Sequence, residues 1–204
     1  MKINDSQYLK RALKFFFFVL IILVITTILS TIFMPTKEEL KSIGDTLPKR
    51  LDQAKGLNLV GQYIIHNGFA VPLQMFILAL IPIPFLYSIN LLSTTIPLGI
   101  LLGFAINLNI KVGIAMILST IPHASFELFA FCLVASGLYQ VNKSMTRKLT
   151  NIFRKQKKEN ISFKEAFINF IKIFICRALP LFIIAAFLEA YLATDLYRFF
   201  KNLI

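Results

Sequence analysis

Two ionisable side chains, His123 and Glu127, lie in an otherwise apolar stretch of the chain. They are four residues apart, so a helix would place both on one face. Pro122 precedes them and removes a backbone donor, which predicts a kink at that point. Imidazole and carboxylate groups are costly at bilayer depth, and they are therefore candidates for a proton relay, an ion site or a metal centre.

Arg177 and Glu189 lie in the next apolar segment. Counted from the basic loop between the two segments, Glu127 and Arg177 reach similar depths, whereas Glu189 lies nearer the other face. The structural alternative to a functional site is a buried Glu127–Arg177 pair, with His123 bonded to a neighbouring helix. Arg177 has the further option of extending back toward the lipid headgroups. The sequence leaves these interpretations open.

The chain lacks the motifs of common membrane enzymes. It contains no HExxH sequence and no Walker motif. Its two cysteines, Cys132 and Cys176, are too far apart in the sequence to form a CxxC pair. One histidine with two carboxylates is too few for a zinc site. We therefore expect a non-enzymatic protein without a metal or other cofactor. An intramembrane hydrolase remains as the enzymatic alternative.

The composition is that of a membrane protein. Hydrophobic residues make up 57% of the 204 residues, the mean hydropathy is +0.73 and 21 residues are Phe. Residues 56–110 include no Asp, Glu, Lys or Arg, and about 20 apolar residues cross a bilayer as a helix. The strand alternation of a barrel is absent. The sequence thus predicts an all-α, multi-pass transmembrane bundle that forms one integral domain over residues 1–204.

Five spans are expected along this domain. Their approximate limits are 15–34, 69–87, 91–108, 112–138 and 170–193. An outer loop, 35–62, follows the first span, and a basic inner loop, 139–166, precedes the last. Pro82 and Pro84 bend the approach to the turn between the second and third spans.

The net charge of +12 arises largely from Lys and Arg in the N-terminal tail and in the inner loop. The positive-inside rule places both segments in the cytoplasm, and five spans then put the C-terminus outside. This distribution explains the charge without a nucleic-acid partner. Where the inner loop is amphipathic, it would meet anionic lipid. Apolar residues at helical spacing in the tail, 194–204, predict a short interfacial helix.

Gly99 and Gly103 form a GxxxG pair in the third span. Small residues at this spacing let two helices approach closely in lipid. We therefore expect this face of the third span to pack against another helix.

Three stretches carry a resemblance to a known family. Residues 121–128 (IPHASFEL) are similar to its L-P-H-G-x-x-E-L, residues 187–192 (FLEAYL) to its C-terminal E-A-x-x-(S/T), and the Gly99…Gly103 stretch to its N-G-x-x-x-G. The chain resembles the stage II sporulation protein M family in these motifs and in its layout along nearly the whole length. It departs from the pattern at Leu98, where members carry Asn, and at Ala124, where they carry Gly.

The resemblance implies a non-enzymatic protein of the bacterial cytoplasmic membrane that acts as a scaffold or as a subunit of an envelope complex. Sporulation members anchor peptidoglycan-degrading partners at the septum during engulfment. Other members occur beside circular-bacteriocin genes and serve in peptide export or self-immunity with an ABC-type ATPase. The expected partners are therefore membrane or soluble proteins, including such an ATPase subunit or a peptidoglycan-acting complex.

Overall fold

The computed structural model describes residues 5–33 and 56–204, and in these residues it contains helices and no strand. Five helices are long and apolar enough to cross a membrane. They are α1 (Tyr8–Phe33), the helix Leu57–Leu80, the helix Leu86–Leu108, α6 (Ile110–Phe153) and the helix Phe163–Leu203. The expected all-α, multi-pass fold is confirmed. Most of the expected outer loop, 35–55, lies outside the described residues.

Three of the long helices are divided into segments. Leu57–Leu80 consists of α3 (Leu57–Tyr63), the π-helical η2 (Ile64–Ala70) and α4 (Val71–Leu80). Leu86–Leu108 begins with a single 3₁₀ turn, η3 (Leu86–Ser88), and continues as α5 (Ile89–Leu108). The segments of Phe163–Leu203 are α7 (Phe163–Ile173), η4 (Phe174–Ala178), α8 (Leu179–Phe187), η5 (Leu188–Leu192) and α9 (Ala193–Leu203), of which η4 and η5 are π-helical.

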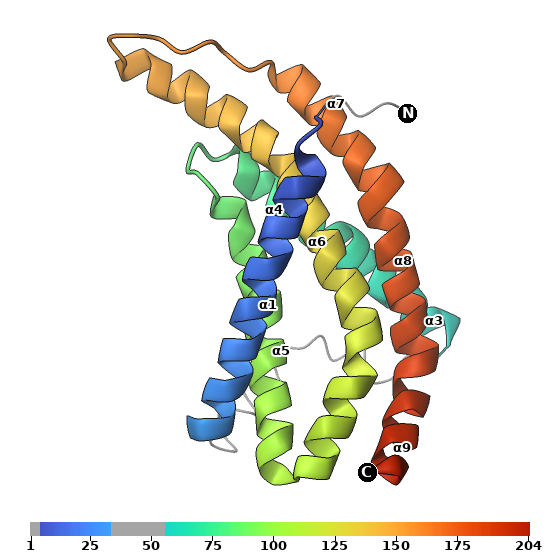
Figure 1. Cartoon of the computed structure of the whole chain (residues 1–204). Coiled ribbons are helices and arrows are strands. Elements are labelled where there is room, and N and C mark those ends of the chain that lie inside the picture. Colours follow the sequence, from blue (N-terminus) through green and yellow to red (C-terminus); the bar gives the residue numbers. More distant parts are fainter. Residues whose placement is uncertain (1–4, 34–55) are drawn as a thin grey trace.

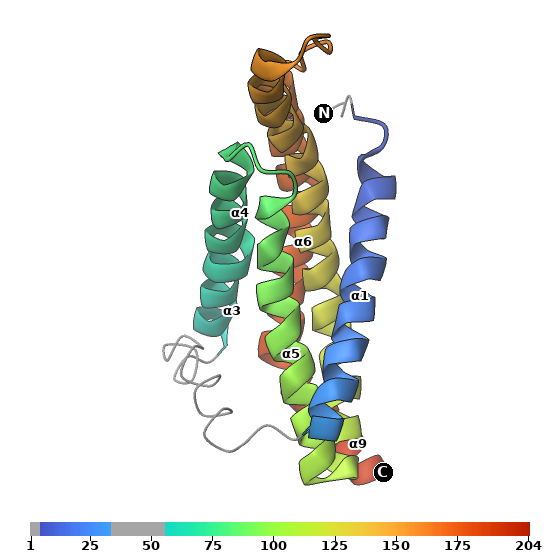
Figure 2. The ribbon, with the colours of Figure 1, turned by 90° about the vertical axis from the view of Figure 1, so that its left-hand side faces the viewer.

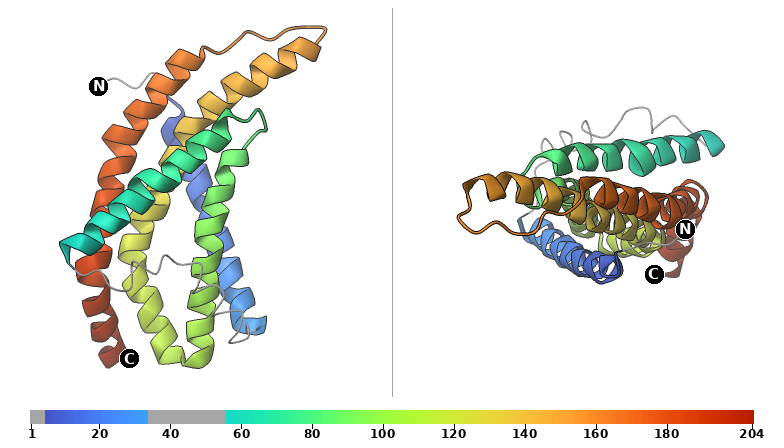
Figure 3. Two further views of the ribbon diagram at one scale, coloured as in Figure 1. Left: turned by 180° about the vertical axis from the view of Figure 1, so that it is seen from behind. Right: turned by 90° about the horizontal axis from the view of Figure 1, so that it is seen from above.

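The helix α6 is the centre of the bundle. It packs against α1, α4, α5, α7, α8 and α9, and its middle part, residues 130–138, is almost continuously buried. The helix formed by α3 and α4 lies on one side of α5 and α6, and α1 lies on the other side (Figure 2). Seen from behind, α3 and α4 cross the bundle obliquely (Figure 3). Many apolar side chains of α1 stay exposed, including Phe17, Ile21 and Ile32, as expected for a helix that faces lipid.

Glycines and hydroxyl groups join α1 to α5. A Cβ atom added to Gly99 or Gly103 would collide with Thr26 or with the Thr27 carbonyl. Ser30 Oγ donates to the Ile100 carbonyl at 2.9 Å, and Asn107 Nδ2 donates to the Thr31 carbonyl at 2.6 Å. The two helices therefore lie close enough for backbone groups of one to bond side chains of the other, which is the usual way for small residues to join helices in lipid.

The helix limits differ from the expected spans at several places, and α1 already begins at Tyr8 instead of 15. The second helix covers Leu57–Leu80 instead of 69–87. It ends early because Ile81 is extended and is followed by Pro82, which has no N–H to continue the helix. α6 continues from the expected end at 138 to Phe153, and the last helix begins at Phe163 instead of 170. Much of the expected inner loop, 139–166, is therefore helical, and the connection between α6 and α7 consists of residues 154–162. The tail is also part of the last helix and does not form a separate one.

Different segments of the chain lie at the two ends of the bundle. The start of α1 and the connection between α6 and α7 lie at one end, whereas the turn between α5 and α6 lies with the C-terminus at the other (Figure 1). At the first end, Arg11 forms an ion pair with Asp5 and lies 4.8 Å from the ring centre of Tyr139. At the second, Lys111 Nζ donates to the Ile204 carbonyl at 2.7 Å. The two basic segments, the N-terminal tail and the α6–α7 connection, thus share one end.

Candidate functional site: an intramembrane pair of carboxyl groups

The site lies where three helices meet: α6, the Leu57–Leu80 helix and the last helix. Glu127 is contributed by α6, which contains Pro122 and bends along its length (Figure 1). The other two helices contribute through their π-helical segments: Asn67 lies in η2 and Glu189 lies in η5. A π-helical turn has one residue more than an α-helical turn and commonly marks functional positions.

Glu127 and Glu189 lie close enough for their charges to interact. The side chain of Asn67 is hydrogen-bonded to Glu127, and the side chain of Tyr63 is hydrogen-bonded to Glu189. Each carboxyl group thus has a neutral partner on the Leu57–Leu80 helix, and Glu189 is the charged group that acts on Glu127. The four side chains form the carboxyl cluster: Tyr63, Asn67, Glu127 and Glu189.

His123 lies beside this cluster on α6 but has a different environment. Its side chain is partly buried, and its buried Nδ1 atom has no hydrogen-bond partner. The alternative in which His123 bonds a neighbouring helix is therefore not supported through this nitrogen. If Nδ1 carries the ring proton, it is an unbonded donor; if the other ring nitrogen carries it, Nδ1 is a free acceptor.

The buried Glu127–Arg177 pair, which the sequence leaves open as an alternative, is not present in the described residues. Arg177 lies in η4 with an exposed side chain, and it forms no ion pair with a carboxylate in the described part of the chain. Counting residues along the two helices places both side chains at one level, but it does not determine which helix face each one occupies. Arg177 faces outward, whereas Glu127 faces Asn67 and Glu189.

Asn67 and Tyr63 are the residues of the cluster that the sequence did not single out. The expected second span, 69–87, leaves Asn67 outside the membrane segment. A signal for them does exist in the sequence: the uncharged run begins at Gly56, and Tyr63 and Asn67 are four residues apart, at helical spacing. A helix begun at residue 57 places both on one face inside the membrane.

The chemistry available to this cluster is limited. Two neighbouring carboxyl groups repel each other when both are ionised, so they favour a shared proton or a bound cation between them. In the described ranges no three His, Cys, Asp or Glu side chains are grouped as metal ligands. The arrangement therefore suits the binding of a proton, a monovalent cation or a cationic group of a peptide.

These features define a multi-pass helical membrane protein with a pair of carboxyl groups among its helices. A family model described as Stage II sporulation protein M matches residues 11–194. The chain belongs to this family, and the resemblance noted in its motifs is confirmed. The matched region includes the α1–α5 contact and all four residues of the carboxyl cluster. Comparison with curated proteins and with solved structures gives no match.

Proposed function

We propose that this protein is a non-enzymatic scaffold of the bacterial cytoplasmic membrane, and that it holds a soluble subunit of an envelope complex at the cytoplasmic face. The observation that carries this proposal is the length of α6. Its 44 residues extend about 66 Å, roughly twice the ~30 Å hydrocarbon core. The C-terminal part of α6, residues 139–153, is polar and basic, so we assign it to the cytoplasm.

The projecting part of α6, residues 139–153, together with the connection 154–162, is called the basic arm. Two large apolar side chains at the end of this helix are strongly exposed, Ile152 at 70% and Phe153 at 83%. Lysines and arginines surround them, among them Lys148, Arg154 and Lys155. An apolar tip with a basic rim suits a soluble protein that offers an apolar pocket and an acidic surround.

A photo-crosslinking residue introduced at Ile152 tests this proposal in intact cells. We expect a discrete product between the full-length protein and a soluble protein with an acidic surface. A crosslinker at Phe33, which is 76% exposed at the opposite end of the bundle, is the matched control and should not give this product. The double variant Ile152→Ser, Phe153→Ser should release the same soluble protein on purification. Identical products from both positions, or retention by the double variant, would reject the arm as the docking site.

The carboxyl cluster supports a second candidate function, in which the protein binds a cationic apolar peptide and works with an ABC-type ATPase in export or self-immunity. The supporting observation is that Glu127 and Glu189 meet between the helices. Cells that carry Glu127→Gln with Glu189→Gln should lose protection against such a peptide while the protein is still expressed. The variant Arg177→Gln, outside the cluster, is the control. Full protection in the double variant would remove the carboxyl groups from the function.

A further inference from the structure

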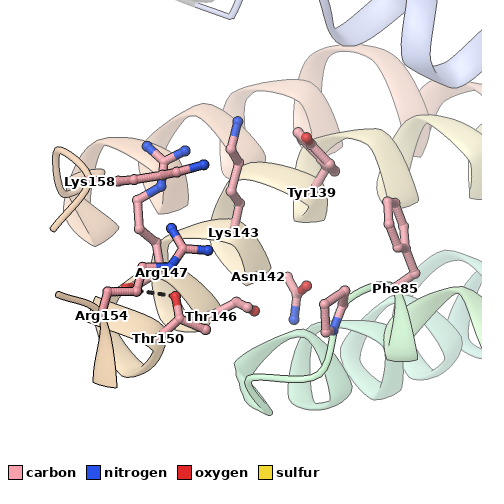
Figure 4. A pocket seen from close by; sticks show the side chains of 10 residues that line it. Phe85, Tyr139, Asn142, Lys143, Thr146, Arg147, Thr150, Arg154 and Lys158 are labelled. Atoms are coloured by element: carbon pink, nitrogen blue, oxygen red, sulfur yellow. Dashed lines mark hydrogen bonds between the residues drawn. The ribbon is translucent and has the colours of Figure 1, made fainter. Parts of the chain in front are cut away.

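A pocket with a volume of about 230 Å³ opens where the basic arm meets the turn between α4 and α5. Four basic side chains line it: Lys143, Arg147, Arg154 and Lys158. Figure 4 shows Lys158 and Arg154 at one end of the pocket and Phe85 at the other. The lining therefore changes from cationic to apolar across the pocket.

Hydrogen bonds hold the walls of this pocket in place. Asn142 Nδ2 contacts three carbonyl oxygens at the end of α4 and in the turn after it, those of Ala79, Ile81 and Ile83, at 2.9–3.1 Å. The turn that carries Pro84 and Phe85 is thereby fixed against α6. On the opposite wall, the Asn151 side chain bonds both the N–H and the carbonyl of Lys158. The connection after α6 is folded back toward the helix, and the pocket exists before any ligand arrives.

Within residues 5–33 and 56–204, no carboxylate forms an ion pair that would neutralise the positive charge of the pocket. None of the four basic side chains forms an ion pair with a carboxylate in the described residues. Arg147 donates to the backbone carbonyl of Glu159 at 3.0 Å, not to its carboxylate. The hydroxyl of Thr146, in the same wall, is buried and has no hydrogen-bond partner. Uncompensated cations beside an unbonded hydroxyl favour an anion with several acceptor oxygens.

The position of the pocket indicates which kind of molecule bears that anionic group. The α4–α5 turn connects two helices that are long and apolar enough to cross a membrane, so it lies at the membrane surface. Ile83 and Phe85, both in this turn, are about half exposed, at 52% and 49%. Apolar side chains at this level enter the boundary between headgroups and acyl chains. The basic end of the pocket then lies at the level of the headgroup phosphates.

We propose that this pocket binds the phosphate group of an anionic phospholipid, with its basic end on the phosphate and with Phe85 against the glycerol and upper acyl region. Arginine is well suited to this role, because its planar guanidinium group makes paired hydrogen bonds to phosphate. A free phosphate would use the basic end alone, whereas a lipid uses both ends. The inference does not rest on the proposed scaffold role: the pocket shares Arg154 with the basic rim of the arm but involves neither Ile152 nor Phe153.

The test uses the purified full-length protein in detergent and a short-chain fluorescent phosphatidylglycerol as the probe. The triple variant Arg147→Gln, Arg154→Gln, Lys158→Gln should bind the probe at least about tenfold more weakly than the unaltered protein. The triple variant Lys155→Gln, Lys157→Gln, Lys164→Gln removes the same charge from exposed positions outside the pocket and should bind within about twofold. Equal loss in both variants would mean that only diffuse surface charge attracts the lipid, and the pocket would be rejected.

Two further measurements keep the proposal falsifiable if the pocket variant does not fold. Phosphatidylglycerol should protect Arg147 and Arg154 of the unaltered protein from an arginine-modifying reagent, whereas exposed Arg198 in α9 should stay reactive. Equal modification with and without lipid at the pocket arginines would overturn the proposal. Inorganic phosphate, added at the same concentration as the fluorescent phosphatidylglycerol, should not displace this probe. Displacement by inorganic phosphate would show that the pocket is a site for free phosphate and would overturn the assignment to lipid.

Discussion

Glu127 is tolerated inside the bundle because Asn67 satisfies part of its hydrogen-bonding capacity. The partner is a neutral amide and not a cation, so the pair adds no second desolvated charge. The contact with Asn67 determines which replacements of Glu127 the bundle tolerates. A side chain that keeps the shape and polarity of Glu127 should keep the contact, whereas an apolar one leaves the Asn67 amide unsatisfied at bilayer depth.

We therefore predict that Glu127→Gln changes the thermal stability of the detergent-solubilised protein little, whereas Glu127→Leu destabilises it by about 1–3 kcal/mol. Thermal unfolding followed by intrinsic tyrosine fluorescence or by aggregation measures both. Arg177→Gln is the comparison, and as an exposed side chain it should cost no more than about 0.5 kcal/mol. If Arg177→Gln were as damaging as Glu127→Leu, the arginine would be a partner of Glu127 after all.

At the scale of elements, two of the three π-helical segments in the described part of the chain have an identifiable cause. η2 is followed directly by α4, which has Pro72 in its first turn, and η4 is followed by α8, which has Pro180 there. Proline lacks an N–H, and its ring clashes with the carbonyl oxygen four residues earlier, which widens the preceding turn. η5 is not followed by a proline in this way, and the structure offers no comparable cause for it.

The contact between α1 and α5 is the second feature at this scale. A methyl group on Gly103 would collide with the backbone of α1, which has no flexible end to move aside. We predict that Gly103→Ala destabilises the protein by about 1–3 kcal/mol, because overpacking forces the helices apart. Gly61→Ala in α3 is the matched control, since its methyl group would meet nothing within 4 Å. Thermal unfolding of the two variants in the same detergent decides this, and equal melting temperatures would show that the two helices are not in tight contact here.

At the scale of the whole molecule, the sequence predicts the bundle far better than its site. A run of 55 residues without Asp, Glu, Lys or Arg, 56–110, allows only a membrane segment, and two of the five long apolar helices of the described residues lie in it. The partners of Glu127 could not be predicted, since depth along a helix can be counted but the face it presents cannot. π-helical turns add to this difficulty: each one rotates the side chains after it relative to a regular helix.

The second helix begins before the expected span for a related reason. Gln62, His66 and Asn67 make the start of the second helix look polar, so the span was placed later. In the folded bundle Asn67 is satisfied by a neighbouring helix, and the backbone continues through this region as a helix from Leu57. A polar residue ends a span only when nothing inside the membrane bonds to it. That information lies in the tertiary structure and not in the local pattern.

The orientation of the bundle follows from the ends that these helices bring together. The start of α1 and the basic arm lie at one end, and the C-terminus lies at the other (Figure 1). Lys and Arg near the ends of spans are retained in the cytoplasm, so both basic segments favour the same orientation. We predict that reporters fused at Gln156 and at Ile204 give opposite signals, with Gln156 in the cytoplasm. A phosphatase that is active only outside and a fluorescent protein that folds only inside provide the two readouts. Equal signals would require an even number of crossings between the two positions, although only the helix Phe163–Leu203 lies between them, and that helix would then lie on the membrane surface without crossing it.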